Sequence, residues 1–290
     1  MRILKLVVPV LSTLISLSSM AQEKFDLYTG LPRGSESWTW KEEEFTNAAD
    51  SVELVANISR PSLEIVRPVS GKSTGTAAII CPGGGFYYLS YINEGMNMAR
   101  FLAERGVTCF VLRYRLVQTK GMPSETVFKD LAAGTYQKKT AAVVPLAIED
   151  GRQAIAWVRE HAEEYGIQKN RIGILGFSAG GTVAAASMFA YQPANRPDFT
   201  AVVYPYFPAE RIGAIPADAP PLFIACAGND NLGFAPHSVG LYSAWLRAGK
   251  PAELHMYAEG GHGFGTKPLS SHTRTWTDRL ADWMRSLGLI

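Results

Sequence analysis

The feature of this sequence that most constrains its fold is the alternation of strand-like and helix-like segments from about residue 76 to the C-terminus. Short apolar runs bounded by Gly or Pro predict buried strands, and the segments between them carry apolar residues at helical spacing. The predicted strands are 61–69, 75–82, 107–116, 171–177, 199–207, 221–228 and 252–260. The predicted helices are 95–106, 148–166, 179–191, 235–249 and 270–288. Because parallel strands need crossover connections, this order predicts an α/β fold with a mostly parallel central sheet and helices on both faces.

The first 21 residues have the composition of a secretory signal peptide. Arg2 and Lys5 give a basic start, an apolar stretch covers residues 6–17, and small residues precede a cleavage point after Ala21. The apolar stretch is too short for a stable membrane helix, so a retained anchor is the less favoured alternative. We therefore expect a secreted or periplasmic protein without stable membrane insertion.

The rest of the chain is expected to form a polar N-terminal arm, 22–57, followed by one α/β domain, 58–290, because no linker-like stretch divides it. Lys and Arg number 28 and Asp and Glu 26, and the two charged residues of the signal peptide are both basic, which leaves 26 of each. That balance predicts no nucleic-acid surface. Three cysteines lie in apolar runs and are expected to be buried free thiols: Cys81, Cys109 and Cys226. No pattern of His and Cys suggests a metal site, and no cofactor is expected.

One short motif, ILGFSAGG at residues 174–181, marks Ser178 as a candidate nucleophile. A strand, then Gly-x-Ser-x-Gly, then a helix is typical of a nucleophile elbow. The turn is so sharp that its neighbours must be small, and Gly176 and Gly180 meet that need. The helix N-terminus there favours a developing negative charge. The alternative is an inert Ser in a Gly-rich turn.

A nucleophilic Ser needs a general base, and His262 is the best candidate. It lies in EGGHGFG (residues 259–265), a Gly-rich loop directly after the last predicted strand. Glycines on both sides allow the backbone to carry an imidazole toward the ends of other strands. The remaining histidines are expected to be solvated, capping or packed residues: His161, His237, His255 and His272.

The acid that orients the base is expected between Ser178 and His262 in the chain. Asp230 is the only carboxylate in the loop that follows the strand at 221–228. Its alternative role is to cap the next helix. Glu259 and Asp218 are weaker candidates for the acid, because the first is close in sequence to His262 and the second precedes its strand.

The Gly-rich segment CPGGGFYY, residues 81–88, is expected to supply donors for an oxyanion. We expect the N–H groups of Gly84, Gly85 and Ala179 to form the oxyanion hole. A phosphate-binding loop is the disfavoured alternative, because no Lys-Ser/Thr pair follows and no GxGxxG occurs.

Three aromatic residues follow the glycines, and two interpretations of them stay open. Phe86, Tyr87 and Tyr88 either line the mouth of the site and bind substrate, or at least two of them pack in the core. Residues 117–145 are irregular and are expected to be either a mobile flap over the site or a plain surface excursion.

Taken together, PGGGF, GFSAGG, GND and GGHGFG resemble the α/β-hydrolase superfamily from about Arg60 to the C-terminus. More narrowly, they resemble the bacterial carbohydrate-esterase-like and dienelactone-hydrolase-like group, which includes acetyl xylan esterases. RPSLEIVRP and VLRYRL are also similar to that group. The chain departs from the related hormone-sensitive-lipase-like enzymes at Pro82, where those usually carry His. The acid loop also departs from the usual pattern, because a Pro often follows the Asp and here Asn231 does.

The resemblance implies a single α/β-hydrolase domain that hydrolyses esters of small molecules or polysaccharides through Ser178, His262 and Asp230. Removal of acetyl groups from xylan-like carbohydrate is the expected reaction. The alternatives are a lipase-like esterase, a peptidase or amidase of the same fold, and a catalytically silent binding protein. The last would be expected to lack the Ser, the His or the glycine donors, and this chain has all of them.

Overall fold

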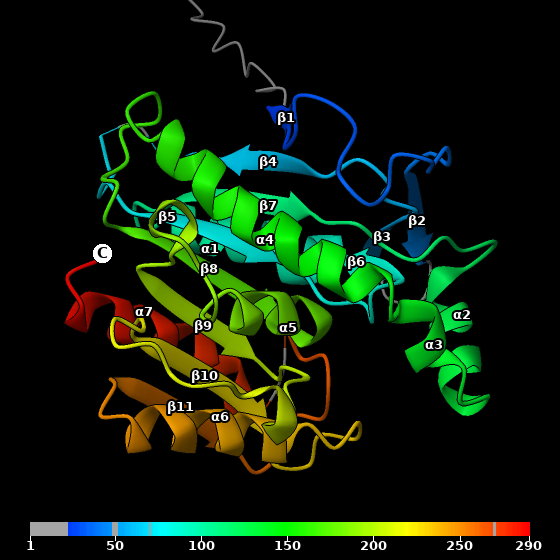
Figure 1. The fold of residues 1–290 in the computed structure, drawn as a ribbon. Helices are drawn as coiled ribbons and strands as arrows, with labels where there is room; N and C mark the ends of the chain where they lie inside the picture. The colour runs from blue at the N-terminus through cyan, green and yellow to red at the C-terminus, as the bar shows by residue number, and fades with distance from the viewer. Residues whose placement is uncertain (1–22, 48–51, 70, 269–270) are drawn as a thin grey trace, which may run out of the picture.

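An eight-stranded sheet forms the centre of the molecule (Figure 1). The structure is a computed structural model that describes residues 23–47, 52–69, 71–268 and 271–290. In spatial order the strands are β1 (Lys24–Asp26), β4 (Ser62–Val66), β7 (Thr108–Arg113), β5 (Ala77–Cys81), β8 (Ile172–Phe177), β9 (Phe199–Val203), β10 (Leu222–Ala227) and β11 (Ala252–Tyr257). β1 and β4 are antiparallel at one edge, and all pairs from β7 to β11 are parallel. The predicted mostly parallel sheet is confirmed.

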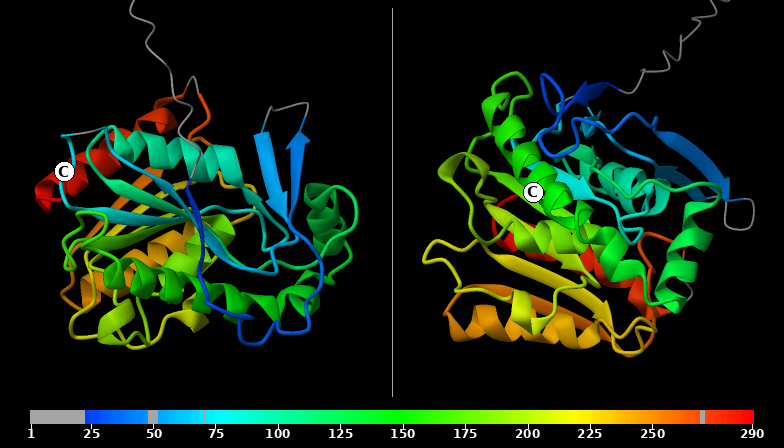
Figure 2. Two further views of the ribbon diagram at one scale, coloured as in Figure 1. Left: turned by 90° about the horizontal axis from the view of Figure 1, so that it is seen from above. Right: turned by 45° about the vertical axis from the view of Figure 1, so that its right-hand side comes forward.

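Helices cover both faces of this sheet, as the alternation in the sequence predicted. The helices of the described residues are α1 (Asn97–Ala103), α2 (Pro123–Ala132), α3 (Tyr136–Thr140), α4 (Val143–Glu160), α5 (Ser178–Ala186), α6 (Ala235–Arg247) and α7 (Trp276–Ser286). A π-helical segment, η1 (Tyr91–Met96), precedes α1, and the short 3₁₀ helices are η2 (Pro193–Asn195), η3 (Ala209–Arg211) and η4 (His272–Thr275). α1 and α7 lie on one face, and α4, α5 and α6 lie on the other (Figure 2, left).

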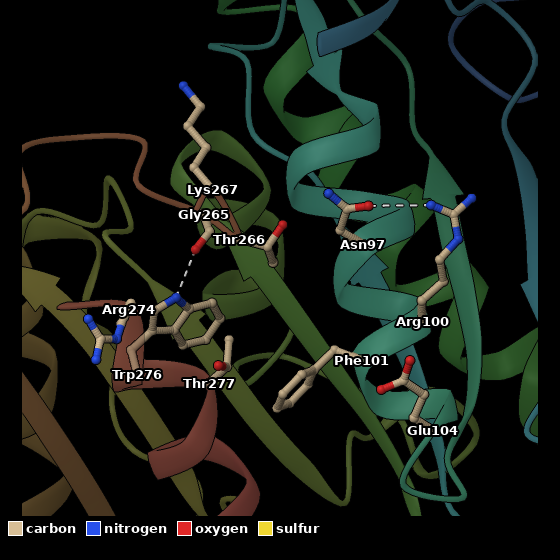
Figure 3. Close-up of a pocket in the computed structure, with 10 residues that line it drawn as sticks. All are labelled: Asn97, Arg100, Phe101, Glu104, Gly265, Thr266, Lys267, Arg274, Trp276 and Thr277. Carbon is tan, nitrogen blue, oxygen red and sulfur yellow. Dashed lines mark hydrogen bonds between the residues drawn. The ribbon is translucent and has the colours of Figure 1, made fainter. Parts of the chain in front are cut away.

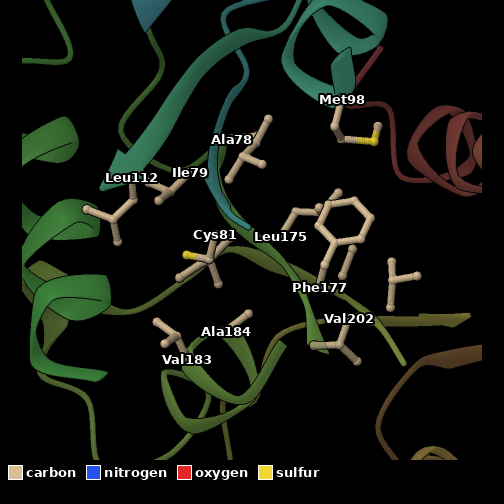
Figure 4. Close-up of a cluster of buried hydrophobic side chains, with 14 of the residues drawn as sticks. Ala78, Ile79, Cys81, Met98, Leu112, Leu175, Phe177, Val183, Ala184 and Val202 are labelled. Atoms are coloured by element: carbon tan, nitrogen blue, oxygen red, sulfur yellow. The ribbon is translucent and has the colours of Figure 1, made fainter. Parts of the chain in front are cut away.

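The core lies on both sides of the central strands, which is why these strands are almost continuously apolar. β5, β7, β8, β9 and β10 are buried at every residue, whereas the edge strand β11 is partly exposed. Figure 4 shows Met98 of α1 packed on one side of β5, and Val183 and Ala184 of α5 packed on the other. The three cysteines lie in β5, β7 and β10 as buried free thiols. In the described part of the chain, no helix combines the length and apolar character needed to cross a bilayer.

The segment expected to be a polar arm contributes strands to the fold. β1 pairs with β4 at the edge of the main sheet. β2 (Glu43–Asn47) and β3 (Val52–Ala56) form a second, three-stranded antiparallel sheet with β6 (Tyr88–Ser90). The division of the chain after residue 57 stays a prediction, and the predicted signal peptide lies outside the described residues.

The irregular stretch 117–145 contains two helices, α2 and α3, beyond the carboxyl ends of β5 and β7 (Figure 1). The carboxylate of Asp130 on α2 accepts hydrogen bonds from Tyr87 Oη at 2.7 Å and from Lys139 Nζ at 2.7 and 2.8 Å. These contacts attach the two helices to the loop that follows β5. Because the parallel strands all end at this edge, the loops after them converge here.

Candidate active site

Ser178 lies at the junction of β8 and α5, in the left-handed region of backbone space with a φ of 50°. The backbone of residues other than glycine is strained in this region, and such strain is typical of functional positions. The neighbouring glycines have no room for a side chain. A Cβ at Gly176 would lie 2.1 Å from the carbonyl oxygen of Gly180, and a Cβ at Gly180 would lie 2.0 Å from that of Cys81. The local geometry is therefore that of a nucleophile elbow.

His262 is brought from the loop after β11 into contact with both Ser178 and Asp230. Its Nε2 lies 2.9 Å from Ser178 Oγ, and its Nδ1 lies 2.8 Å from Asp230 Oδ2. The tautomer that satisfies both contacts has Nδ1–H donating to the carboxylate and Nε2 accepting from the hydroxyl. The three side chains thus form one hydrogen-bonded line, although their catalytic roles stay predictions at this point.

The environment of Asp230 keeps its carboxyl group ionised. Burial by itself raises the pKa, but the hydrogen bond and the charge of His262, together with the backbone N–H of Leu232, lower it below the usual value. The Asp230 side chain is fully shielded from solvent. A charged acceptor that is already in position therefore holds the imidazole in one orientation.

The weaker candidates for the acid lie elsewhere. Asp218 accepts from Tyr191 Oη and pairs with Arg196 on the surface. Glu259 is exposed, and its backbone oxygen accepts from Thr273 Oγ1.

Two asparagines that flank Asp230 fix the loop that carries His262. The side-chain oxygen of Asn229 accepts from Gly261 N, and that of Asn231 accepts from His262 N, both at 2.9 Å. Asn231 is the position where the related enzymes often have Pro, which has no side-chain acceptor. Sequence reasoning noted the departure but missed its use, since the contact joins residues 31 apart in the chain.

Gly83, the residue before the two predicted oxyanion glycines, lies beside Ser178. A Cβ at Gly83 would lie 3.0 Å from Ser178 Cβ. Gly84 and Gly85 both have positive φ, 133° and 62°, and a Cβ at Gly84 would lie 2.0 Å from Tyr88 O. The chain therefore turns away from the strand in a way that only glycine allows. The donor role of Gly84, Gly85 and Ala179 stays a prediction.

A buried carboxylate that sequence reasoning missed connects this glycine loop to the histidine loop. Glu94 Oε2 accepts from Gly83 N at 2.8 Å, and its Oε1 accepts from Tyr204 Oη at 2.7 Å. Tyr204 Oη in turn accepts from Gly265 N at 2.8 Å. Burial raises the pKa of Glu94, while the hydrogen bonds from Tyr204 and Gly83 oppose the shift.

The three aromatic residues after the glycines differ in their exposure. Phe86 is buried and packs on Tyr114, with ring centroids 6.2 Å apart. Tyr87 is buried and donates to Asp130, whereas Tyr88 is only half-buried. Their substrate contacts stay predictions.

Other aromatic residues lie around the candidate base. Phe234 lies 5.0 Å from His262 between ring centroids, Tyr206 lies 5.2 Å from Phe234, and His237 lies 5.1 Å from Tyr206. None of these had been predicted to line the site, because they belong to loops and helix starts without a motif. Burial lowers the pKa of His237, which favours its neutral form.

A cavity of about 340 Å³ lies behind the histidine loop, between α1 and the segment Gly265–Lys267 (Figure 3). Trp276 Nε1 donates to Gly265 O at 2.8 Å and closes one side of it. Among the described residues, no group of three or more His, Cys, Asp or Glu side chains is arranged to hold a metal ion.

Comparison with known proteins gives matches of three kinds. The BD-FAE family model matches residues 130–215. An acetylxylan esterase of Xylanibacter ruminicola is 26% identical over 246 residues, which are 74% of this chain and 46% of that protein. The probable carboxylic ester hydrolase LipM of Mycobacterium tuberculosis is 24% identical over 59% of this chain and 45% of its own length. The chain thus spans less than half the length of these two relatives.

Solved structures are similar over most of the chain. An acetyl ester-xyloside bifunctional hydrolase from Caldicellulosiruptor lactoaceticus matches with a TM-score of 0.66 and 23% identity, over 93% of this chain and 97% of that one. Esterase 2 of Thermogutta terrifontis, phosphorylated by paraoxon, matches with a TM-score of 0.63 and 21% identity, over 86% and 95%.

The sheet order, the strand-to-helix turn at Ser178 and the similar solved structures define an α/β-hydrolase fold. In sequence the chain is similar to an acetylxylan esterase and to a probable carboxylic ester hydrolase.

Proposed function

We propose that this protein is a serine-dependent carboxylic ester hydrolase that removes acetyl groups from carbohydrate. The observation that carries the proposal is the continuous hydrogen-bonded line from Ser178 Oγ through His262 to Asp230. A hydroxyl, an imidazole and an ionised carboxylate in that order are the parts of an acyl-transfer site.

In the first half of the reaction, Ser178 Oγ attacks the ester carbonyl carbon while His262 Nε2 accepts the hydroxyl proton. The carbonyl oxygen becomes an oxyanion, which accepts hydrogen bonds from the N–H groups of Gly84, Gly85 and Ala179. As the tetrahedral intermediate collapses, the bond to the alcohol oxygen breaks. His262 gives its proton to that oxygen, and the acyl group stays on Ser178.

In the second half, water takes the place of the alcohol. His262 removes a proton from the water as it attacks the acyl carbon, and the proton then returns to Ser178 Oγ as the carboxylic acid leaves. Asp230 remains ionised throughout and stabilises the imidazolium form of His262.

The choice of carbohydrate acetate rests on the relatives. An acetylxylan esterase and an acetyl ester-xyloside hydrolase are among the proteins similar to this chain. The signal-like residues 1–21 support export to the periplasm or the exterior, where polysaccharides are met.

The test is hydrolysis of p-nitrophenyl acetate, butyrate and octanoate, and of acetylated xylan, by the wild type and Ser178→Ala. We expect preference for acetate, and a loss in kcat on the order of 10⁶ in the variant, as found for another serine hydrolase. The matched control is Ser187→Ala at the C-terminal end of α5, since the only hydrogen bond of its Oγ among the described residues is the one that it donates to Val183 O.

Each alternative gives a different result. Activity that rises with acyl chain length favours a lipase-like esterase. Cleavage of amides but not esters favours a peptidase or amidase. Near-normal turnover by a folded Ser178→Ala protein rules out the mechanism, and folded wild-type protein with no hydrolytic activity favours a silent binding protein.

A further inference from the structure

A second cavity of about 340 Å³ lies at the carboxyl edge of the sheet. We call it the Trp pocket and define it by Trp38, Trp40, Tyr87, Gln118, Asp130 and Lys139. It brings together the N-terminal segment, the loop after β7 and the helices α2 and α3. Tyr87 forms one wall of the pocket and lies next to the candidate oxyanion loop in the chain. Its backbone N donates a hydrogen bond to Gly84 O at 3.1 Å.

The aromatic part of the Trp pocket is a stacked indole pair. The rings of Trp38 and Trp40 have centroids 4.5 Å apart and an interplanar angle of 28°. Both side chains are only half-buried, although large aromatic rings gain free energy from burial. The indole N–H of Trp40 is buried and has no hydrogen-bond partner among the described residues. The flat apolar faces of the two half-buried indoles suit the C–H face of a sugar ring.

The polar part of the Trp pocket favours an uncharged ligand. Asp130 and Lys139 form an ion pair at 2.7 Å, so their charges compensate each other. The carboxylate also accepts from Tyr87 Oη and Thr135 Oγ1, and these contacts leave it little capacity for a cationic ligand. An ammonium group has three donors, and Lys139 uses two on Asp130, so one remains for a ligand hydroxyl. Gln118 adds an amide that can both donate and accept.

The size of the cavity limits the ligand further. Small-molecule pockets range over about 300–1,000 Å³, and this one is near the lower end. It suits a short glycan segment rather than a protein partner.

From these observations we infer that the Trp pocket is a subsite for a neutral glycan, which binds sugar units neighbouring the one whose ester is at Ser178. The identity of the ester in this inference rests on the proposed function, whereas glycan binding by the Trp pocket does not depend on it. Stacking on Trp38 and Trp40 holds the chain, and Gln118 and Lys139 bind its hydroxyls.

The experiment has a binding arm and a kinetic arm. In the binding arm, an unacetylated xylo-oligosaccharide is titrated into the Ser178→Ala protein and into Ser178→Ala/Trp38→Ala, with tryptophan fluorescence and calorimetry as readouts. We expect the affinity to fall roughly tenfold or more without Trp38. In the kinetic arm, the ratio of kcat/KM for an acetylated xylo-oligosaccharide to that for p-nitrophenyl acetate falls by a similar factor in Trp38→Ala.

Two further variants keep the test decisive. Gln118→Ala should weaken glycan binding even if Trp38→Ala fails to fold. Phe128→Ala removes an exposed aromatic ring of α2 that does not line the pocket, and should change neither readout.

The possible results separate the two proposals. If the pocket variants lose glycan binding while the wild-type protein hydrolyses no ester, the subsite is supported and the proposed function is contradicted. Ester hydrolysis with unchanged binding and an unchanged kinetic ratio in both pocket variants supports the function and overturns the subsite.

Discussion

At the scale of single residues, Tyr204 has the contact that most clearly joins two parts of the site. Its hydroxyl donates to Glu94 and accepts from Gly265 N, and its φ of 40° is unusual for a residue other than glycine. Tyr204→Phe removes both hydrogen bonds. We expect a loss of about 1.5–3 kcal/mol in unfolding free energy, as for hydrogen bonds to charged groups, measured by denaturant titration. We also expect kcat to fall about ten- to hundredfold, because the histidine loop loses its anchor.

The pH dependence of the unfolding free energy distinguishes a hydrogen-bonding role of Tyr204 from a role in packing alone. The tyrosine hydroxyl stabilises the ionised form of Glu94, whose pKa burial raises above its usual 4.5. The loss in unfolding free energy caused by Tyr204→Phe should therefore be greatest at pH values above the pKa of Glu94. It should become smaller as the pH falls through that pKa, because the carboxyl group is then protonated. The matched control is Tyr191→Phe, whose hydroxyl donates to the exposed Asp218. Equal effects of the two substitutions would contradict the assignment.

Residues with a local signature were predictable from the sequence, whereas residues defined by distant contacts were not. Ser178 and His262 are flanked by glycines in the sequence. Such a glycine pattern indicates a turn whose backbone conformation only glycine adopts easily. Glu94 has no such signature, because its partner Tyr204 is 110 positions away in the chain.

At the scale of secondary-structure elements, the close approach of α5 to β5 fixes the position of the candidate nucleophile. A Cβ at Gly180 would lie 2.0 Å from Cys81 O and 2.5 Å from Pro82 O, and backbone oxygens cannot move without moving the strand. Gly180→Ala should therefore destabilise the fold by about 1–3 kcal/mol or more. It should also reduce kcat, because α5 must shift and carry Ser178 with it. Thermal unfolding and ester hydrolysis measure the two effects.

A second helical glycine provides the control for this prediction. A Cβ at Gly240 on α6 would meet its nearest atom, Ile212 Cδ1, at 3.9 Å, which is an ordinary contact. Gly240→Ala should stabilise the protein by up to about 1 kcal/mol, because alanine favours a helix. A stable, fully active Gly180→Ala protein would show that the contact between α5 and β5 is not restrictive.

The length and the periodic pattern of each element determine whether it could be predicted from the sequence. The buried parallel strands follow from apolar runs, and most long helices follow from their spacing. α2 and α3 were not predicted, because short helices among glycines and lysines carry little periodic signal. β1 was also missed, since a three-residue strand is recognisable only by its pairing with β4, some 38 residues further along the chain.

At the scale of the whole molecule, a buried ion pair connects the N-terminal segment to the main fold. Arg115 and Asp150 are almost completely shielded from solvent, with Nη2 and Oδ1 2.6 Å apart. Arg115 Nη1 also donates to Arg33 O and Ser35 Oγ, at 2.7 and 3.2 Å. One side chain thus joins residues of the expected arm to α4 and to the end of β7, which indicates that the arm folds together with the sheet.

Arg115→Met tests this connection. The substitution leaves Asp150 buried without its cation, so we expect a loss of about 3–5 kcal/mol in unfolding free energy. Cleavage of the N-terminal segment by a protease should become faster, because its contacts to the guanidinium are lost. The double variant Arg115→Met/Asp150→Asn should recover part of the loss, since no unpaired charge then remains. The control Arg285→Met breaks the exposed pair with Asp282 and should cost no more than about 1 kcal/mol. Similar losses in the two single variants would mean that the buried pair does not hold the segment in place.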